Sequence, residues 1–219
     1  SGVATDLLHC LQVLLKRTPG GLALSVTIMG TIMAATTGII GASVVMMSLL
    51  ALPVMLERGY QVQLASGTIA ASATLGILIP PSIMLVIMAD LLSISVGTLF
   101  LAAIFPGLLL AVLYLVYIYI RTRLNPSLAP PLPDSLGPDT KAELYVMVFR
   151  SFVPPISLIV FVLGSIFAGW ATPTEAAGVG ALGAVLLALM NRRLNYQVLK
   201  DVLIRSALTI GMIFGIFIG

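Results

Sequence analysis

Long apolar runs separated by short polar connections form the main pattern of this 219-residue chain. A helix needs about 20 apolar residues to cross the hydrocarbon core of a bilayer. Runs near that length recur at about 64–90, 99–120, 151–170, 175–191 and 203–219. Backbone amides and carbonyls must be paired inside hydrocarbon, and a helix pairs them within one segment. The pattern therefore predicts an all-α integral membrane protein, a polytopic helical bundle.

The first segment, 1–18, is shorter and has two kinds of face. In "VATDLLHCLQVLL", residues 3–15, leucines and valines surround Asp6, His9 and Gln12. A short amphipathic stretch of this kind is typical of a helix that lies in the membrane interface. We expect an interfacial arm that ends at "KRTPGG".

An uncharged stretch from 22 to 56 is interrupted at 36–43 by "TTGIIGAS". Its length of about 35 residues is long for one span and short for two spans with a loop between them. A re-entrant helical hairpin fits this length, with the glycines at its tip. One long tilted helix followed by a short loop segment is the alternative that the residues leave open.

The next apolar stretch, about 64–90, carries two adjacent prolines within "GTIAASATLGILIPPSIMLVIMAD". Pro81 has no amide hydrogen and its ring clashes with the preceding turn, while the proline after Pro80 pushes Pro80 toward an extended backbone. These prolines predict a broken transmembrane helix. A break frees N–H and C=O groups, and each costs several kcal/mol in hydrocarbon unless it meets protein or a watery cavity.

The distribution of positive charge supports this layout. If the hairpin enters and leaves on one face, all eleven basic residues fall in four connections on that side: 16–20, 57–62, 121–150 and 192–205. The two opposite connections, 91–97 and 171–174, contain none. Cytoplasmic loops carry the excess of Lys and Arg, so the basic side is predicted to be cytoplasmic. Residues 95–219 then hold further transmembrane helices, with a proline-rich cytoplasmic loop at 121–141.

Composition agrees with a membrane protein and excludes several other classes. The chain is 59% hydrophobic and 9% charged, against about 25% charged residues in soluble domains. Its net charge of +3 is explained by the topology, so we expect no nucleic-acid partner. Cys10 is the single cysteine and His9 the single histidine, which excludes an internal disulfide and leaves little for a transition metal or haem.

The hairpin tip and the broken helix are the places where chemistry is expected. Broken helices point half-helix N-termini at anionic groups and freed carbonyls at Na⁺ near the bilayer midplane. No carboxylate lies inside either break, so a monovalent cation fits better than Ca²⁺ or Mg²⁺. The alternative is that Gly and Pro are simply frequent in membrane helices and that Ser and Thr bond back to their own helix. Neighbouring hydroxyls could supply neutral oxygen ligands: Thr36, Thr37, Ser43, Ser72, Thr74 and Ser82.

A third feature, "GWATPTEAAGVGALGA" at 169–184, favours a structural role. Thr172 or Thr174 can cap the following helix, with Pro173 in its first turn and Glu175 near the positive end of the helix dipole. Glycines and alanines form a small-residue face for close helix packing. Glu175 is also a weaker candidate for a proton or cation site. Motifs of proteases and ATP-driven pumps are missing from the sequence, so we expect no enzyme.

The order and spacing of these segments resemble a known family. "TTGIIGASVVMMSLLALPVMLERGY", "GTIAASATLGILIPPSIMLVIMAD", "SVGTLFLAAIFPGLLLA" and "ATPTEAAGVGA" look like the large membrane subunit of tripartite ATP-independent periplasmic (TRAP) transporters. The resemblance implies an elevator-type secondary transporter built from inverted repeats and driven by Na⁺, with no cofactor beyond this coupling ion. It also implies a small organic acid as substrate, a periplasmic substrate-binding protein and a small membrane subunit as partners, and the cytoplasmic (inner) membrane of a bacterium or archaeon.

Carried onto this chain, the resemblance makes 19–94 the transport-domain elements and gives scaffold elements to 95–219. A second hairpin with its broken helix is expected outside the 219 residues, which would be an internal piece of a longer chain. A membrane channel or a proton-coupled transporter that uses the same hairpin is the alternative function. The cation and substrate candidates are those at the hairpin tip and the break: Gly38, Gly41, Ala42, Ser43, Pro80, Pro81 and Ser82, with Thr37, Thr74 and Glu175 weaker.

Overall fold

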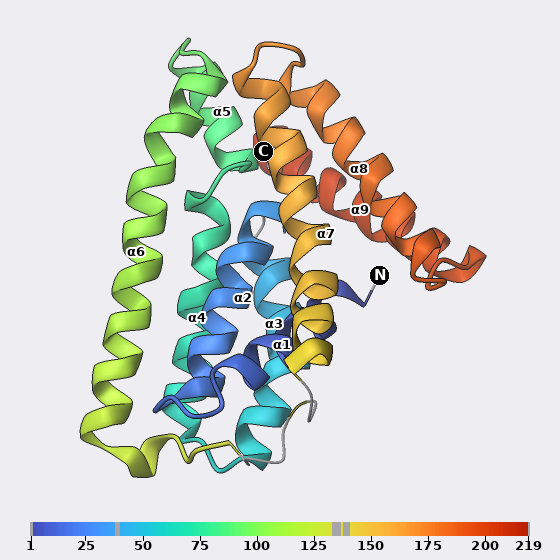
Figure 1. The fold of residues 1–219 in the computed structure, drawn as a ribbon. Helices are drawn as coiled ribbons and strands as arrows, with labels where there is room; N and C mark the ends of the chain where they lie inside the picture. Colours follow the sequence, from blue (N-terminus) through green and yellow to red (C-terminus); the bar gives the residue numbers. More distant parts are fainter. Residues whose placement is uncertain (1, 38–39, 133–136, 138–140, 219) are drawn as a thin grey trace.

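The computed structural model describes residues 2–37, 40–132, 137 and 141–218, and within them every regular element is a helix. This confirms the all-α prediction. A 3₁₀ turn, Pro126–Leu128, follows the sixth helix. The α-helices, shown in Figure 1, are α1 Val3–Leu14, α2 Gly21–Thr37, α3 Ile40–Glu57, α4 Val62–Leu78, α5 Ile83–Leu91, α6 Val96–Leu124, α7 Lys141–Phe167, α8 Pro173–Met190 and α9 Tyr196–Ile218.

Helices α2 and α3 form the predicted hairpin. They pack on one another and on α4, and their free ends lie at the same end of the bundle (Figure 1). This excludes a single long tilted helix. Gly30 of α2 lies at a close approach of the three helices, because a Cβ there would lie 2.8 Å from the Cβ of Ser72 and 2.9 Å from the Cε of Met47. Only a residue without a side chain allows this approach.

The base of the hairpin is fixed by a tyrosine. The phenol oxygen of Tyr60, which is buried in the α3–α4 connection, accepts the backbone N–H of Leu22 at 3.2 Å. Leu22 lies in the first turn of α2, where an N–H has no acceptor within its own helix. One side chain therefore satisfies this amide and joins the two ends of the hairpin. Burial raises the pKa of the Tyr60 phenol, so the group stays neutral.

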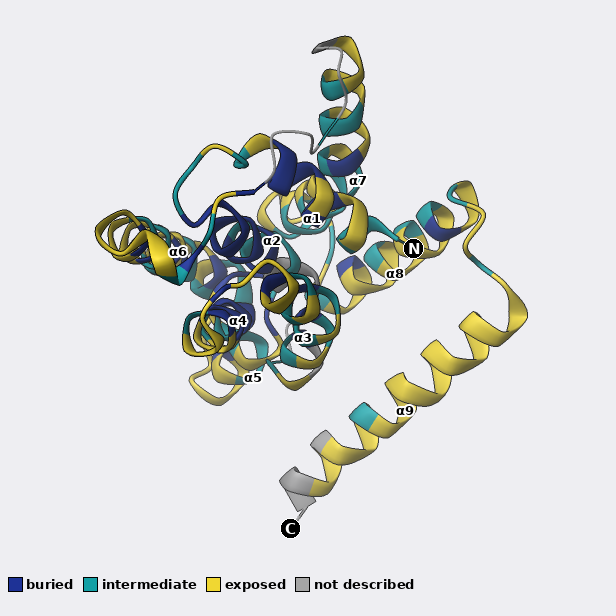
Figure 2. Ribbon diagram, turned by 90° about the horizontal axis from the view of Figure 1, so that it is seen from below, coloured by how far each residue is buried: buried dark blue, intermediate teal, exposed yellow. Residues whose placement is uncertain are grey.

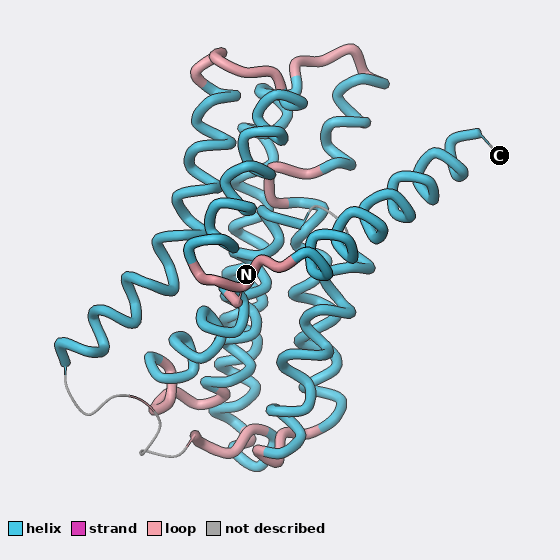
Figure 3. The backbone as a smooth tube through the Cα atoms, turned by 90° about the vertical axis from the view of Figure 1, so that its right-hand side faces the viewer, coloured by secondary structure: helices cyan, strands magenta, loops and turns pink. Residues whose placement is uncertain are grey.

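The broken helix is also present. Helix α4 ends at Leu78 and α5 begins at Ile83, and the two are bent by 40° at the intervening four residues. The break coincides with Pro80 and Pro81, as predicted. Figure 3 shows it as a short loop about midway along the bundle.

Within the described part of the chain, three further helices are long and apolar enough to cross a membrane: α6, α7 and α8. Few of their described residues are buried, and many are exposed (Figure 2), as expected of helices that face lipid or further protein. Helix α6 reaches Leu124 and α7 begins at Lys141, so the connection is shorter than the predicted loop at 121–141. The cause is local, because Arg121 and Arg123 favour a helix C-terminus and the first breaker is the Asn125–Pro126 pair.

The connections at 92–95 and 168–172 lie at one end of the bundle, and those at 15–20, 58–61 and 125–132 lie at the other (Figure 1). The connections without basic residues thus lie at the end of the bundle opposite the basic connections, as the charge pattern predicts. The link between α8 and α9, with Arg192 and Arg193, is different. Helix α8 leans away from the bundle, and Figure 1 shows this link at the side, about midway between the two ends.

Helix α1 differs from the expected interfacial arm. Its pattern is helical and amphipathic as predicted, but the apolar face, with Leu7, Leu8 and Leu11, is buried and packs with α2 and α7. The face assigned to the membrane surface therefore lies against protein. A one-segment pattern cannot distinguish these surroundings, since both bury the same leucines.

The close approach at Gly30 generates a test. We expect Gly30→Ala to lower the free energy of unfolding by about 1–3 kcal/mol, because the methyl group overpacks the contact with Ser72 and Met47. Gly164→Ala is the matched control in α7, since nothing lies within 4 Å of its Cβ position. Thermal unfolding of the complete permease measures both. Equal midpoints for the two variants would show that the three helices do not meet at Gly30.

Candidate functional site

The break between α4 and α5 leaves backbone groups without helical partners. In an uninterrupted helix, the carbonyls of Gly76 and Ile77 would accept the amides of residues 80 and 81. Both of those residues are proline and have no amide hydrogen. On the other side, the first-turn amides of α5 have no acceptor within that helix. The break thus offers carbonyl oxygens for a cation and N–H groups for an anion.

Ser82 lies at the N-cap of α5 but does not cap it. Its side chain is 1% exposed, and its hydroxyl has no hydrogen-bond partner among the described residues. The Ser82 carbonyl accepts the amide of Val86 at 3.1 Å, so the backbone there is already committed to the helix. A buried hydroxyl without a partner is rare and costly, and it requires a reason. A ligand that binds this oxygen would supply one.

A cavity of about 440 Å³ lies beside the break. Pro81 and Ser82 line one side of it, and Phe100 of α6 lines another. The opposite side consists of α7 and the small residues of α8, among them Gly180 and Ala184. The break therefore faces a space that it shares with α6, α7 and α8, the helices that resemble scaffold elements.

Helix α6 supports the break from the other direction. A Cβ at Gly107 would lie 3.0 Å from the side chain of Ile79 and 3.4 Å from the carbonyl oxygen of Leu78. Leu75, Ile79 and Ala111 form a small buried cluster at this contact. The last turn of α4 is thus held on α6, which fixes where its free carbonyls lie.

The hairpin tip lies at the level of the break. Gly30 of α2 touches Ser72 of α4, and both helices run in the same direction from there. Thr37 and Ile79 are each seven residues further on, which is about 10 Å along each axis at 1.5 Å per residue. Ser43 is buried, with 3% exposure, and Gly41 is exposed. Gly38 and the side chains of Thr37 and Ala42 lie outside what the structure describes.

Other candidate hydroxyls are used within the fold. Thr74 donates to the carbonyl of Ala71 at 2.7 Å, and Ser72 donates to the Thr27 hydroxyl at 3.3 Å. Thr74 therefore follows the alternative interpretation, in which a hydroxyl bonds back to its own helix. Among the described residues no group of three or more His, Cys, Asp and Glu side chains could hold a metal ion.

Glu175 has a structural partner. Its carboxylate accepts the backbone N–H of Thr172 at 2.7 Å and the Thr172 hydroxyl at 2.8 Å, and its own N–H reaches the Thr172 oxygen at 3.4 Å. This reciprocal capping box starts α8 and identifies Thr172 as the cap. Further along, Gly180 and Gly183 lie against Val162 and Leu158 of α7, which confirms the small-residue packing face.

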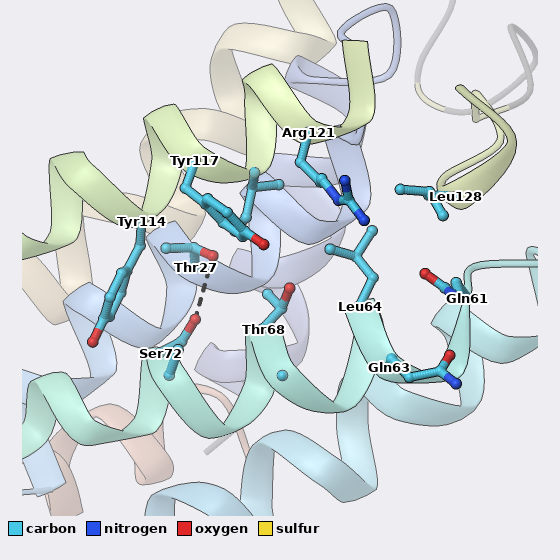
Figure 4. A pocket seen from close by; sticks show the side chains of 13 residues that line it. Thr27, Gln61, Gln63, Leu64, Thr68, Ser72, Tyr114, Tyr117, Arg121 and Leu128 are labelled. Atoms are coloured by element: carbon cyan, nitrogen blue, oxygen red, sulfur yellow. Dashed lines mark hydrogen bonds between the residues drawn. The ribbon is translucent and has the colours of Figure 1, made fainter. Parts of the chain in front are cut away.

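Sequence reasoning missed a second, polar pocket, which lies between α2, α4 and α6 (Figure 4). Tyr114, Tyr117 and Arg121 of α6 line it, opposite Thr68 of α4. The spacing of three and four residues was a usable signal, since it puts the three α6 side chains on one helix face. No sequence pattern identifies Thr68 as a pocket residue, because its burial depends on how α4 packs.

An all-helical membrane protein with a hairpin, a broken helix and a cavity beside the break has the architecture of a secondary transporter. The family comparison agrees with this class. The chain belongs to the family described as tripartite ATP-independent periplasmic transporter, DctM component, whose model matches residues 1–219. It is thus a transporter permease sequence and not an enzyme.

Individual relatives support the same assignment. The chain is 34% identical over 215 residues to the C4-dicarboxylate TRAP transporter large permease protein DctM of Pseudomonas aeruginosa, covering 97% of this chain and 49% of that protein. It is 30% identical to the 2,3-diketo-L-gulonate TRAP transporter large permease protein YiaN of Escherichia coli, covering 97% and 48%. For the isethionate TRAP transporter permease protein DctMQ of Oleidesulfovibrio alaskensis the identity is 31%, covering 97% and 33%. The chain spans about half the length of the first two of these relatives.

The capping box generates a second test. We expect Thr172→Ala to speed amide exchange in the first turn of α8 about fivefold, because losing a threonine cap costs about 1 kcal/mol. Thr174→Ala is the control, since Thr174 is exposed and does not cap the helix. Hydrogen–deuterium exchange of the complete permease measures both. Faster exchange in Thr174→Ala than in Thr172→Ala would contradict the assignment.

Proposed function

We propose that this chain forms half of the transport unit of a Na⁺-coupled uptake system for a small organic acid. A periplasmic substrate-binding protein would deliver the acid, and a small membrane subunit would brace the helices that resemble a scaffold. The location would be the cytoplasmic (inner) membrane. Membership of the DctM family supports this proposal, and so do the printed names of relatives, which include a C4-dicarboxylate and a 2,3-diketo-L-gulonate transporter.

One observation carries the Na⁺ part of the proposal: at the break where Pro80 and Pro81 free two carbonyls, the buried hydroxyl of Ser82 has no hydrogen-bond partner among the described residues. Neutral hydroxyl and carbonyl oxygens suit a monovalent hard cation such as Na⁺. They suit Ca²⁺ less well, because it favours carboxylates. The amides of the α5 first turn have the opposite polarity and would suit the carboxylate of the substrate.

The mechanism follows from these two polarities. Na⁺ bound at the α4 carbonyls and Ser82 would neutralise the negative end of α4 and order the break. An ordered break would present the α5 amides to the substrate. The hairpin, α4 and α5 would then move together against α7 and α8 across the cavity, as an elevator does. A second hairpin from the remainder of the permease would complete the site.

The test is the unfolding midpoint of the complete permease with its small subunit in Na⁺, K⁺ and choline at equal ionic strength. A ligand at a hundred times its dissociation constant adds about 2.7 kcal/mol to folding, so Na⁺ should raise the midpoint visibly. In Ser82→Ala the midpoint in K⁺ should stay unchanged, since the hydroxyl has no partner to lose. Its gain in Na⁺ should shrink.

Ser66→Ala is the matched control, because Ser66 is exposed on α4 and its hydroxyl donates to the carbonyl of Val62. Its response to Na⁺ should equal that of the wild type. Equal midpoints in all three salts would remove Na⁺ coupling and favour a proton-coupled or passive pathway. Uptake of a radiolabelled C4-dicarboxylate into proteoliposomes, with and without an inward Na⁺ gradient, tests the direction separately.

A further inference from the structure

The polar pocket between α2, α4 and α6 has no part in the proposed Na⁺ site. It measures about 290 Å³ and lies toward the end of the bundle that carries the basic connections. Figure 4 shows Tyr117 and Arg121 reaching from α6 toward α4, with Thr68 and Leu64 facing them. The hydrogen bond between Ser72 and Thr27 lies beside Thr68, one turn further along α4, and it joins α4 to α2.

A hydrogen bond between two loops borders the mouth of the pocket. The backbone N–H of Gln61 donates to the carbonyl of Leu128 at 3.0 Å, and both residues line the pocket. Gln61 and Gln63 are exposed and contribute side-chain amides at the same end. The mouth of the pocket is thus polar, and its inner wall combines apolar side chains with the hydroxyls of Thr27, Thr68 and Ser72.

Two polar groups define the chemistry of the pocket. The hydroxyl of Thr68 is buried, with 5% exposure of the side chain, and has no hydrogen-bond partner among the described residues. Arg121 is the single charged residue that lines the pocket, and no acidic residue does so within the described part of the chain. A hydroxyl that can donate, amide groups and an uncompensated guanidinium together favour an anion.

Arg123, two positions away, shows that this placement is specific. Its guanidinium donates to the Tyr119 hydroxyl at 2.7 Å and lies 5.9 Å from the centre of that ring. It does not line the pocket. The end of α6 therefore carries two arginines of equal charge, of which one is used on the helix surface and the other faces the pocket.

The position of the pocket along α6 indicates the source of the anion. Exposed apolar side chains, including Leu108, Leu109 and Val112, cover the helix before the pocket. Tyr114 and Tyr117 follow, and then Arg121. This order of apolar, aromatic and basic residues is typical of a helix that passes from acyl chains to headgroups. The mouth of the pocket is therefore at headgroup level.

We propose that this pocket binds the phosphate of an anionic phospholipid from the cytoplasmic leaflet, held by Arg121, Thr68 and the amides of Gln61 and Gln63. Arginine binds phosphate oxygens with two parallel hydrogen bonds, which suits this role. A zwitterionic lipid fits less well, because no carboxylate among the described lining residues would receive its ammonium group. The lipid would bridge α4, which packs on the hairpin, and α6.

The test uses the complete permease with its small subunit, stripped of lipid in detergent. Phosphatidylglycerol should raise the unfolding midpoint in a saturable way, and phosphatidylcholine at the same concentration should raise it less. Arg121→Gln should increase the half-saturating concentration of phosphatidylglycerol roughly tenfold or more, as expected for a lost charge-assisted bond. Thr68→Val keeps the shape of the side chain and should weaken binding severalfold, without loss of stability in the absence of lipid.

Arg123→Gln is the matched control and should retain the wild-type response. Equal weakening by Arg121→Gln and Arg123→Gln would show diffuse attraction to a basic surface and would overturn the proposal. Phosphatidylcholine acting as strongly as phosphatidylglycerol would also overturn it. Inorganic phosphate and succinate form a third arm. If either stabilises the protein through Arg121 and phosphatidylglycerol does not, the pocket takes a free anion and the lipid assignment is wrong.

Discussion

Two adjacent prolines in the middle of a membrane-crossing helix are the constraint on which the rest of the structure depends. Hydrocarbon does not tolerate unpaired backbone groups, yet Pro80 and Pro81 withhold two amide hydrogens from the carbonyls of Gly76 and Ile77. The chain packs protein against the break: α6 supports it at Gly107, and α7 and α8 line a cavity beside it. A break kept in such surroundings is an expected place for ions and substrates.

The hairpin depends on the same helix. Helices α2 and α3 meet α4 at Gly30, and Tyr60 joins the start of α2 to the connection that leads into α4. The hairpin and the lower half of the broken helix therefore share one core. A shared core lets these elements move as a unit, and the cavity between the break and α8 provides a surface along which they could separate.

Features set by covalent chemistry could be predicted from the sequence, and features set by tertiary approach could not. The break at Pro80–Pro81 and the capping of α8 by a threonine, Thr172 or Thr174, are local consequences of residue type, and the structure shows the break and selects Thr172. The orphaned hydroxyl of Ser82 depends on which helices enclose it. The same holds for α1, whose apolar face fits lipid or protein equally well until α2 and α7 are placed beside it.

The polar pocket illustrates this limit in another way. Arg121 and Arg123 look equivalent in the sequence, as two cations that flank a transmembrane helix. In the structure, Tyr119 engages one of them and the other faces Thr68 across a pocket. The two arginines lie on different faces of α6. A count of charges in the sequence does not say which face packs against α4.

The central claim is that the carbonyls freed at the break hold Na⁺. It is tested by measuring Na⁺ binding directly in a variant that restores the missing amides. The double variant Pro80→Ala, Pro81→Ala returns two N–H donors to the carbonyls of Gly76 and Ile77. Equilibrium binding of radioactive Na⁺ to the complete permease should then weaken more than tenfold, with a folded protein confirmed by its helical circular dichroism and elution volume. Unchanged Na⁺ affinity in this variant would show that the freed carbonyls do not hold the ion and would contradict the account.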